Sequence, residues 1–171
     1  MKNASMVAIG IAAIIGLSAF FLSQNPTDGT TGNQQSEAKP ATPGELALPL
    51  VTVYKSASCG CCAEWIEHMK DSGFPVEFHN QENLQEHKVR AGLGPGMGSC
   101  HTAFVGDYAI EGHVPADDVK RLLKEKPDIS GLTAPGMPMQ SPGMAPKGSK
   151  PAGYEVIAYK DGEKVGAFSQ Y

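Results

Sequence analysis

The sequence predicts a mixed α/β domain that follows a hydrophobic N-terminal helix and a flexible linker. From residue 50 onward, short β-rich runs alternate with segments of helical periodicity, whereas the residues before it divide into an apolar stretch and a polar one. With 171 residues, 41% of them hydrophobic and 19% charged, the chain can bury one core. Its net charge of −4 and only 14 Lys and Arg residues argue against a nucleic-acid partner.

Residues 1–23 carry the features of an export signal. Met6–Leu22 is apolar apart from two glycines and one serine, and Lys2 precedes it. Its length lies between a long signal-peptide core and a minimal membrane span, and Ser18–Ser23 offers no small-x-small cleavage site. We therefore expect an uncleaved signal anchor, with a cleaved signal peptide or a buried helix as alternatives. Export would place the domain in the bacterial periplasm, tethered to the inner membrane or soluble after cleavage.

Residues 24–49 are expected to form a flexible linker. Gln24–Gly44 contains no Val, Ile, Leu, Met or aromatic residue and is rich in Thr, Gly, Gln and Pro. Such a segment cannot bury enough apolar surface to offset the entropy lost on ordering. The folded domain is therefore expected to span residues 50–171.

The first half of this domain predicts strand, helix, strand and helix in turn. A β-rich run, Val51–Tyr54, leads through a turn-like stretch to a helix that begins at a group of cysteines. Apolar residues recur in this helix at helical spacing, and Gly73 ends it. A second strand at 75–79 and a polar helix at 83–91 follow.

Residues 102–111 predict a β-hairpin about the Gly106–Asp107 turn. Pro115 begins the next helix, and Pro127 ends it. The order is then β-α-β-α-β-β-α, with a C-x-x-C motif, Cys59 to Cys62, where the first strand meets the first helix. This order and this placement predict a thioredoxin-like fold, with another small α/β sandwich as the alternative.

The C-terminal part is expected to add a Met/Pro/Gly-rich loop and a β-hairpin to this unit. Residues 128–153 are interrupted repeatedly by proline and glycine, so no regular structure is expected there. Strands at 155–159 and 164–168 flank an Asp161–Gly162 turn, which is a strong hairpin signal. We expect the methionine-bearing loop to lie across this hairpin.

Four cysteines are expected to converge at one end of the domain: Cys59, Cys61, Cys62 and Cys100. Three begin the first helix, where unpaired N–H groups and the helix dipole stabilise a thiolate. In a thioredoxin-like fold the loop before the third strand faces that helix start, and here Cys100 and His101 replace the usual proline. Three ligands within four residues fit a tetrahedral zinc site poorly, whereas clustered soft thiolates favour Cu(I), with room for more than one ion.

Further candidate ligands, or groups that support the ligands, are His101, His113, Met97, Met137, Met139 and Met144. Each methionine is equally compatible with a packing role. Trp65 is expected in the core, and the remaining histidines are expected to be solvated: His68, His79 and His87.

Several alternatives stay open for the cysteines. A resting disulfide between Cys59 and Cys62 is compatible with metal binding after reduction, and two purely structural disulfides are another alternative. A thiol–disulfide oxidoreductase would use Cys59 as nucleophile and Cys62 as resolving thiol, although Cys100 and His101 remove the usual substrate-pairing surface. A structural zinc or iron–sulfur module is the third interpretation.

Several motifs in order carry a family resemblance. They are Cys59–Cys62 followed by Trp65, then Ser99–Ala103, Ile110–Pro115 and the segment 131–144. Over about residues 50–171 the chain resembles the CopG-like family of exported copper-resistance proteins. The resemblance implies a thioredoxin-like fold, copper bound by the C-x-C-C cysteines and the later cysteine, and redox handling of copper, which leaves enzymatic turnover open. Periplasmic copper donors or acceptors are the expected partners. The glycine-rich stretch around Met97 departs from the family, which tends to have Leu there.

Overall fold

The computed structural model describes residues 47–171, so the expected anchor or signal peptide at 1–23 and most of the linker at 24–49 lie outside the described residues. The helices and strands, in chain order, are β1 (Val51–Lys55), α1 (Gly60–Asp71), β2 (Val76–Asn80), α2 (Gln85–Arg90), β3 (His101–Val105), β4 (Tyr108–Gly112), α3 (Ala116–Glu125), β5 (Gly131–Ala134), β6 (Glu155–Lys160) and β7 (Glu163–Gln170). Within residues 47–171, no helix combines the length and the apolar character that a membrane span requires.

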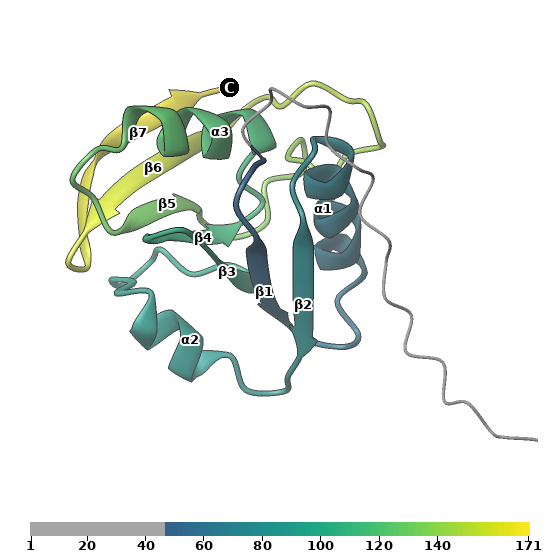
Figure 1. Ribbon diagram of the computed structural model, residues 1–171, viewed down its shortest axis with the longest axis horizontal. Coiled ribbons are helices and arrows are strands. Elements are labelled where there is room, and N and C mark those ends of the chain that lie inside the picture. The colour runs from purple at the N-terminus through teal and green to yellow at the C-terminus, as the bar shows by residue number, and fades with distance from the viewer. Residues whose placement is uncertain (1–46) are drawn as a thin grey trace, which may run out of the picture. The chain divides into compact units, whose positions relative to one another are not determined.

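The strands form one seven-stranded sheet in the order β2-β1-β3-β4-β5-β6-β7 (Figure 1). β1 pairs with β2 and β4 pairs with β5 in parallel, and the other neighbours are antiparallel. The mixed α/β class and the expected order of the first seven elements are confirmed. The C-terminal hairpin is also confirmed: β6 and β7 flank Asp161 and Gly162, whose φ angles of 50° and 82° match the twist of a two-residue hairpin turn.

Alternate residues along the strands separate two cores. Val51 and Val53 of β1, with Leu132 of β5, face α1 and α3, where Trp65 and Val119 complete the larger core. The opposite face of the sheet is covered by α2 and the segment after it, and its smaller core contains Ala91, Met97, Ala109 and Tyr159. Figure 1 shows α2 well apart from α1 and α3. Leu48, just before β1, also packs against the larger core.

The expectation of no regular structure throughout 128–153 was wrong, because β5 lies inside this segment and every residue of β5 is buried. β5 has only four residues, one of them a glycine, so it lacks a β-rich run. A Cβ at Gly131 would overlap the carbonyl oxygen of Ala109 on β4, so the glycine is what allows the two backbones to approach.

The expectation of solvated histidines was wrong for His87. The residue is 7% exposed, its ring stacks on Tyr54 with ring centroids 3.6 Å apart, and its Nε2 lies 2.7 Å from Gln81 Oε1. His68 is partly buried, and its Nε2 accepts a hydrogen bond from the backbone N–H of Ala116 at 3.0 Å. Both histidines are on helices whose polar residues gave no indication of these tertiary contacts.

Candidate metal centre

The candidate centre lies where several chain segments end at one edge of the sheet. The register pairs Lys55 at the end of β1 with His101 at the start of β3, and Gly112 at the end of β4 with Ala134 at the end of β5. The start of α1, the residue before β3 and the residue after β4 therefore lie together. This topology gathers side chains that are far apart in the sequence.

The structure brings the four cysteines together. Cys59 is the N-cap of α1, Cys61 and Cys62 lie in its first turn, and Cys100 precedes β3. Their four sulfur atoms all lie within 4.8 Å of one another. Cys59 and Cys62 form a disulfide, whereas Cys61 and Cys100 are free thiols. The site is therefore in an oxidised state, with two thiols still available.

His113 presents a ring nitrogen to Cys100. The Nε2 atom of His113 lies 3.0 Å from Cys100 Sγ, and Nδ1 lies 2.7 Å from the carbonyl oxygen of Pro142. A carbonyl can only accept a hydrogen bond, so Nδ1 carries the proton and Nε2 directs its lone pair at the sulfur. Burial lowers the pKa of His113, which favours this neutral form, although the hydrogen bond to Pro142 opposes part of the shift.

His101 is buried beside His113. Its side chain is fully buried, with the ring packed 4.5 Å from Trp65 and 5.2 Å from His113 between centroids, and Nδ1 lies 3.5 Å from Cys100 Sγ. Burial, reinforced by His113, lowers the pKa of His101 well below its ordinary value. Its Nε2 is a buried nitrogen without a hydrogen-bond partner among the described residues. Both rings are thus neutral at neutral pH and retain a lone pair.

Cys100 is a protonated thiol at neutral pH in this state. Burial raises its pKa to about 11, and the nearby Cys61 contributes to the increase. A bound cation would displace that proton, so the affinity of the site for metal must depend on pH. Thiol sulfur and neutral imidazole are donors that suit copper and exclude hard cations such as Mg²⁺.

The methionines separate into two groups. Met97 is 8% exposed and belongs to the smaller core, so its side chain has a packing role. Met137 and Met139 are 54% and 69% exposed, which excludes such a role for them, and Met144 is partly buried. The structure therefore gives Met97 a packing role and leaves the thioethers of Met137 and Met139 open to solvent.

The loop after β5 is attached to the candidate centre at two places. The N–H of Gly136 donates to the carbonyl of Gly98 at 3.0 Å, and the Ser99 hydroxyl donates to the carbonyl of Gly136. Farther along, a Cβ at Gly143 would lie 2.6 Å from the carbonyl oxygen of Cys61 and 2.8 Å from the amide nitrogen of Trp65. The loop is thus attached next to the candidate centre, whereas we expected it to lie across the C-terminal hairpin.

Two charged residues at this edge of the sheet were missed by the sequence analysis. Glu111 of β4 is fully buried and forms an ion pair with Lys88 of α2, and the Glu111 carboxylate also accepts the N–H of Ser99. An acidic residue in a strand of otherwise small and apolar residues was the available signal. Its partner on α2 could not be identified without the fold.

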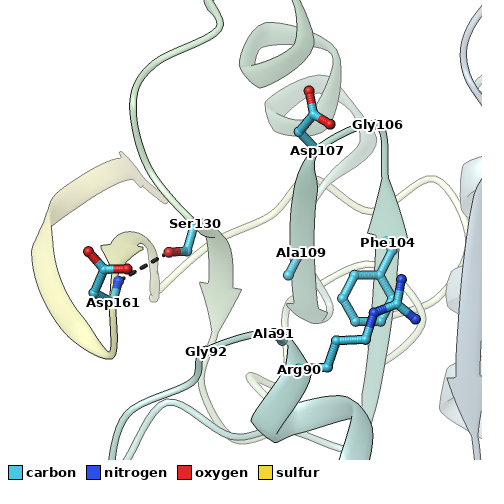
Figure 2. Close-up of a pocket in the computed structure, with 9 residues that line it drawn as sticks. All are labelled: Arg90, Ala91, Gly92, Phe104, Gly106, Asp107, Ala109, Ser130 and Asp161. Atoms are coloured by element: carbon cyan, nitrogen blue, oxygen red, sulfur yellow. Dashed lines mark hydrogen bonds between the residues drawn. The ribbon is translucent and has the colours of Figure 1, made fainter.

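A separate pocket of about 420 Å³ lies on the α2 face of the sheet (Figure 2). Arg90 stacks over the ring of Phe104 at 4.1 Å, and the Ser130 hydroxyl accepts the N–H of Asp161 at 3.1 Å. None of the cysteines or histidines of the candidate centre lines this pocket. Its residues therefore contribute no ligand to the cysteine cluster.

Comparison with known proteins agrees with this geometry. Residues 97–144 match the family described as "Protein of unknown function, DUF411". The solved structure titled "Copper resistance protein copG- Form 1" is 36% identical, with a TM-score of 0.66, and the match covers 72% of this chain and 98% of that one. The chain belongs to the CopG-like copper-resistance family. A second structure, "Copper resistance protein copG- Form 2", is 37% identical over the same shares, with a TM-score of 0.65. No curated protein matches the chain significantly.

The family match at 97–144 contains much of the candidate centre. It includes Cys100, His101 and His113, the buried Glu111 and the loop that carries Gly143. The CopG-like assignment therefore rests on the part of the chain that converges on the start of α1, as well as on the whole domain.

Proposed function

We propose that the protein binds copper for copper tolerance and holds Cu(I) on Cys59, Cys61, Cys62 and Cys100 when these are reduced. The observation that carries the proposal is the convergence of four sulfur atoms within 4.8 Å from two distant segments. Soft thiolates prefer Cu(I), and sulfurs this close together can each bridge two ions, so more than one Cu(I) is expected. Membership of a family whose solved members are named copper resistance proteins supports copper as the metal.

The histidines add nitrogen donors to this site. His113 offers the lone pair of Nε2, and the hydrogen bond from Nδ1 to Pro142 orients the ring. His101, neutral and buried, is placed to complete the donor set or to support it. Among the methionines, Met137, Met139 and Met144 are proposed as further Cu(I) ligands, whereas the packing of Met97 argues against such a role for it.

The redox state of the site controls its copper capacity in this proposal. With the Cys59–Cys62 disulfide present, Cys61 and Cys100 are the remaining thiols. An external dithiol that supplies two electrons and two protons, and is itself oxidised to a disulfide, would reduce this bond to two further thiols, and binding of Cu(I) would then release the thiol protons. Copper binding and thiol redox chemistry are thereby coupled.

The same proposal includes a thioredoxin-like core and a periplasmic location. Three features support the thioredoxin-like core: β1 and β2 are parallel and joined through α1, β3 and β4 are antiparallel, and α3 lies on the same face of the sheet as α1. The apolar segment 6–22 behind Lys2, together with a disulfide that suits an oxidising compartment, supports the periplasmic location. The intact mass of the exported protein decides between an uncleaved anchor and a mature form beginning near Gln24. Copper donor or acceptor proteins of the periplasm are the proposed partners.

Anaerobic titration of the reduced full-length protein with Cu(I), in competition with a colorimetric chelator, tests the proposal. We expect more than one Cu(I) per chain and a preference over Zn(II). Cys100→Ser should lower the Cu(I) affinity by at least about tenfold, because it removes a converging ligand. Met69→Leu, which removes a sulfur from the core without changing its volume, is the control and should leave the affinity unchanged. At most one weakly held ion, or an unaffected Cys100→Ser variant, would refute the proposed site.

The second candidate function is thiol–disulfide exchange. The disulfide of a C-x-x-C motif at the start of α1 favours it, because the helix N-terminus stabilises a thiolate leaving group there. Cys100, just before β3, and His101, its first residue, oppose it, since they occupy the surface where extended substrates pair. Reduction of a disulfide-bonded peptide by the reductant-supplied protein, compared with Cys59→Ser, measures this activity. Multiple turnovers that depend on Cys59 would make exchange the main function.

A further inference from the structure

The buried ion pair between Lys88 and Glu111 brackets Cys100 on both sides. Glu111 is fully buried, and Lys88 reaches it from α2, the helix that lies across the sheet from α1. One carboxylate oxygen of Glu111 accepts the backbone N–H of Ser99 at 2.6 Å, and the other accepts the hydroxyl of Thr102 at 2.7 Å. The residue before Cys100 and the residue two positions after it are therefore bound to one side chain.

Lys88 completes the fixation of Ser99. Its Nζ donates to the carbonyl oxygen of Ser99 at 2.9 Å, in addition to the Glu111 carboxylate. Both backbone polar groups of Ser99 are thus bound by the two charged side chains. Gly112 allows the close approach, because a Cβ at this position, where φ is +70°, would overlap the side chain of Ser99. Pairing with β1 begins only at His101, and the preceding segment also forms an isolated bridge from Ser99 to Gly136. The ion pair supplies the bonds made by the N–H and the carbonyl of Ser99 itself.

We propose that Lys88 and Glu111 are positioning residues that hold Cys100 against His113 and the α1 cysteines, so that the Cu(I) site is preorganised. A buried ion pair is poor evidence for stability alone, because desolvation of two charges offsets much of their attraction. Its hydrogen bonds here all go to the segment that presents Cys100. Neither residue coordinates the metal; each acts through Ser99 and Thr102. The proposal rests on the proposed Cu(I) site for its function, but its geometric content can be tested without metal.

The main test removes both charges at once with the double variant Lys88→Met/Glu111→Leu. Because neither charge is left unpaired, the fold is expected to persist, whereas the bracket around Cys100 is lost. The matched control is Lys164→Met/Glu155→Leu, which makes the same substitutions at an exposed ion pair between β6 and β7. Exposed pairs of this kind contribute little to stability, so the control should behave as wild type.

Alkylation of the oxidised, metal-free, full-length protein by iodoacetamide gives the first readout. Cys61 and Cys100 are then the reactive thiols, and peptide mass analysis follows each separately. We expect Cys100 to react about tenfold faster in the double variant, while Cys61 changes by less than about twofold and serves as internal reference. Equal acceleration of the alkylation of both thiols would indicate a general loosening of the fold. An unchanged alkylation rate at Cys100 would indicate that the ion pair does not fix the segment that presents this residue. Either result overturns the proposal.

Release of Cu(I) from the reduced protein to a chelator gives the second readout. We expect release about tenfold faster than wild type, since groups behind the ligands typically contribute this much. Lys88→Arg keeps the positive charge that pairs with Glu111, so this variant should release Cu(I) at the wild-type rate. If Lys88 acted only by packing, the change to arginine would not be expected to preserve that rate. Glu111→Gln, a gentler substitution in case the double variant does not fold, offers one acceptor oxygen where two are needed, so it should accelerate Cys100 alkylation as well. Unchanged alkylation in a folded Glu111→Gln variant overturns the inference. A wild-type protein that binds no Cu(I), but shows the alkylation difference, refutes the proposed function and leaves the bracket intact.

Discussion

Replacement of Gly143 by alanine tests the contact between the loop after β5 and the candidate centre. Gly143 has a φ of +85°, and an added Cβ would lie 2.6 Å from the carbonyl oxygen of Cys61 and 2.8 Å from the amide nitrogen of Trp65. Both atoms belong to the backbone of α1 and cannot rotate away. Since an ordinary nonbonded contact is about 3.5 Å, the loop has to withdraw by about 1 Å.

A withdrawal of this size separates Pro142 from His113. The hydrogen bond from His113 Nδ1 to the Pro142 carbonyl, 2.7 Å in the structure, would lengthen beyond hydrogen-bond range. Alanine at positive φ costs about 1–2 kcal/mol, and a buried hydrogen-bonding group without its partner costs about 1–3 kcal/mol more. We therefore expect Gly143→Ala to lower the free energy of unfolding by about 2–5 kcal/mol. The Cu(I) affinity should fall about 10–100-fold, because His113 loses its orientation.

Gly148→Ala separates the collision from the backbone strain. Gly148 lies in the same loop with a φ of +87°, but an added Cβ would meet nothing within 4 Å. It should therefore cost only the conformational term, about 1–2 kcal/mol, with Cu(I) affinity unchanged. Urea unfolding of the metal-free protein and chelator competition measure the two quantities. If both variants behave alike in both assays, the loop does not orient His113.

Three further predictions follow from the same structure. Simultaneous substitution of the three loop methionines by leucine should keep the free energy of unfolding within about 1.5 kcal/mol but speed the release of Cu(I) to a chelator; unchanged release would mean that the thioethers do not bind the ion. The substituted residues are Met137, Met139 and Met144. The metal-free protein should lose stability as the pH falls below 6.5, because the unfolded chain takes up protons that the buried histidines do not bind in the folded state. His101 should contribute up to about 1.4 kcal/mol per pH unit to this loss, and His113, whose pKa is also lowered by burial, adds to it. Urea unfolding at several pH values measures this, and an equal slope in His101→Leu would contradict the assignment. Asp118→Ala should cost about 1–3 kcal/mol, since the side chains of Ser169 and Tyr171 lose a buried acceptor, while Cu(I) affinity measured by competition stays unchanged; a fall in affinity would show that the C-terminal strand shapes the site.

Much of the secondary structure could be predicted because its determinants are local. The spacing of apolar residues in α1, the Asp161–Gly162 turn and the proline before α3 each act within a few residues. The position of three cysteines at the start of α1 follows from the same local pattern. Even the approach of Cys100 could be expected, since the element order leaves few ways to place the segment before β3.

Other features were determined only by the tertiary structure, because they depend on contacts between segments that are distant in the sequence and have no local pattern that links them. The need for glycine at position 131 arises from the close approach of the β4 backbone to β5. The burial of His87 arises from the stacking of its ring on Tyr54. Met97 lies in a core, whereas Met137 is exposed, although both lie in glycine- and proline-rich stretches.

The candidate centre shows the same division. Its thiols could be identified from residue type and spacing, because the chemistry of a cysteine belongs to the residue itself. The groups that aim those thiols could not: Pro142 orients His113, and Lys88 and Glu111 fix the segment before Cys100. A hydrogen bond or an ion pair requires two atoms within about 3 Å, and only the folded chain determines which distant residues meet that condition.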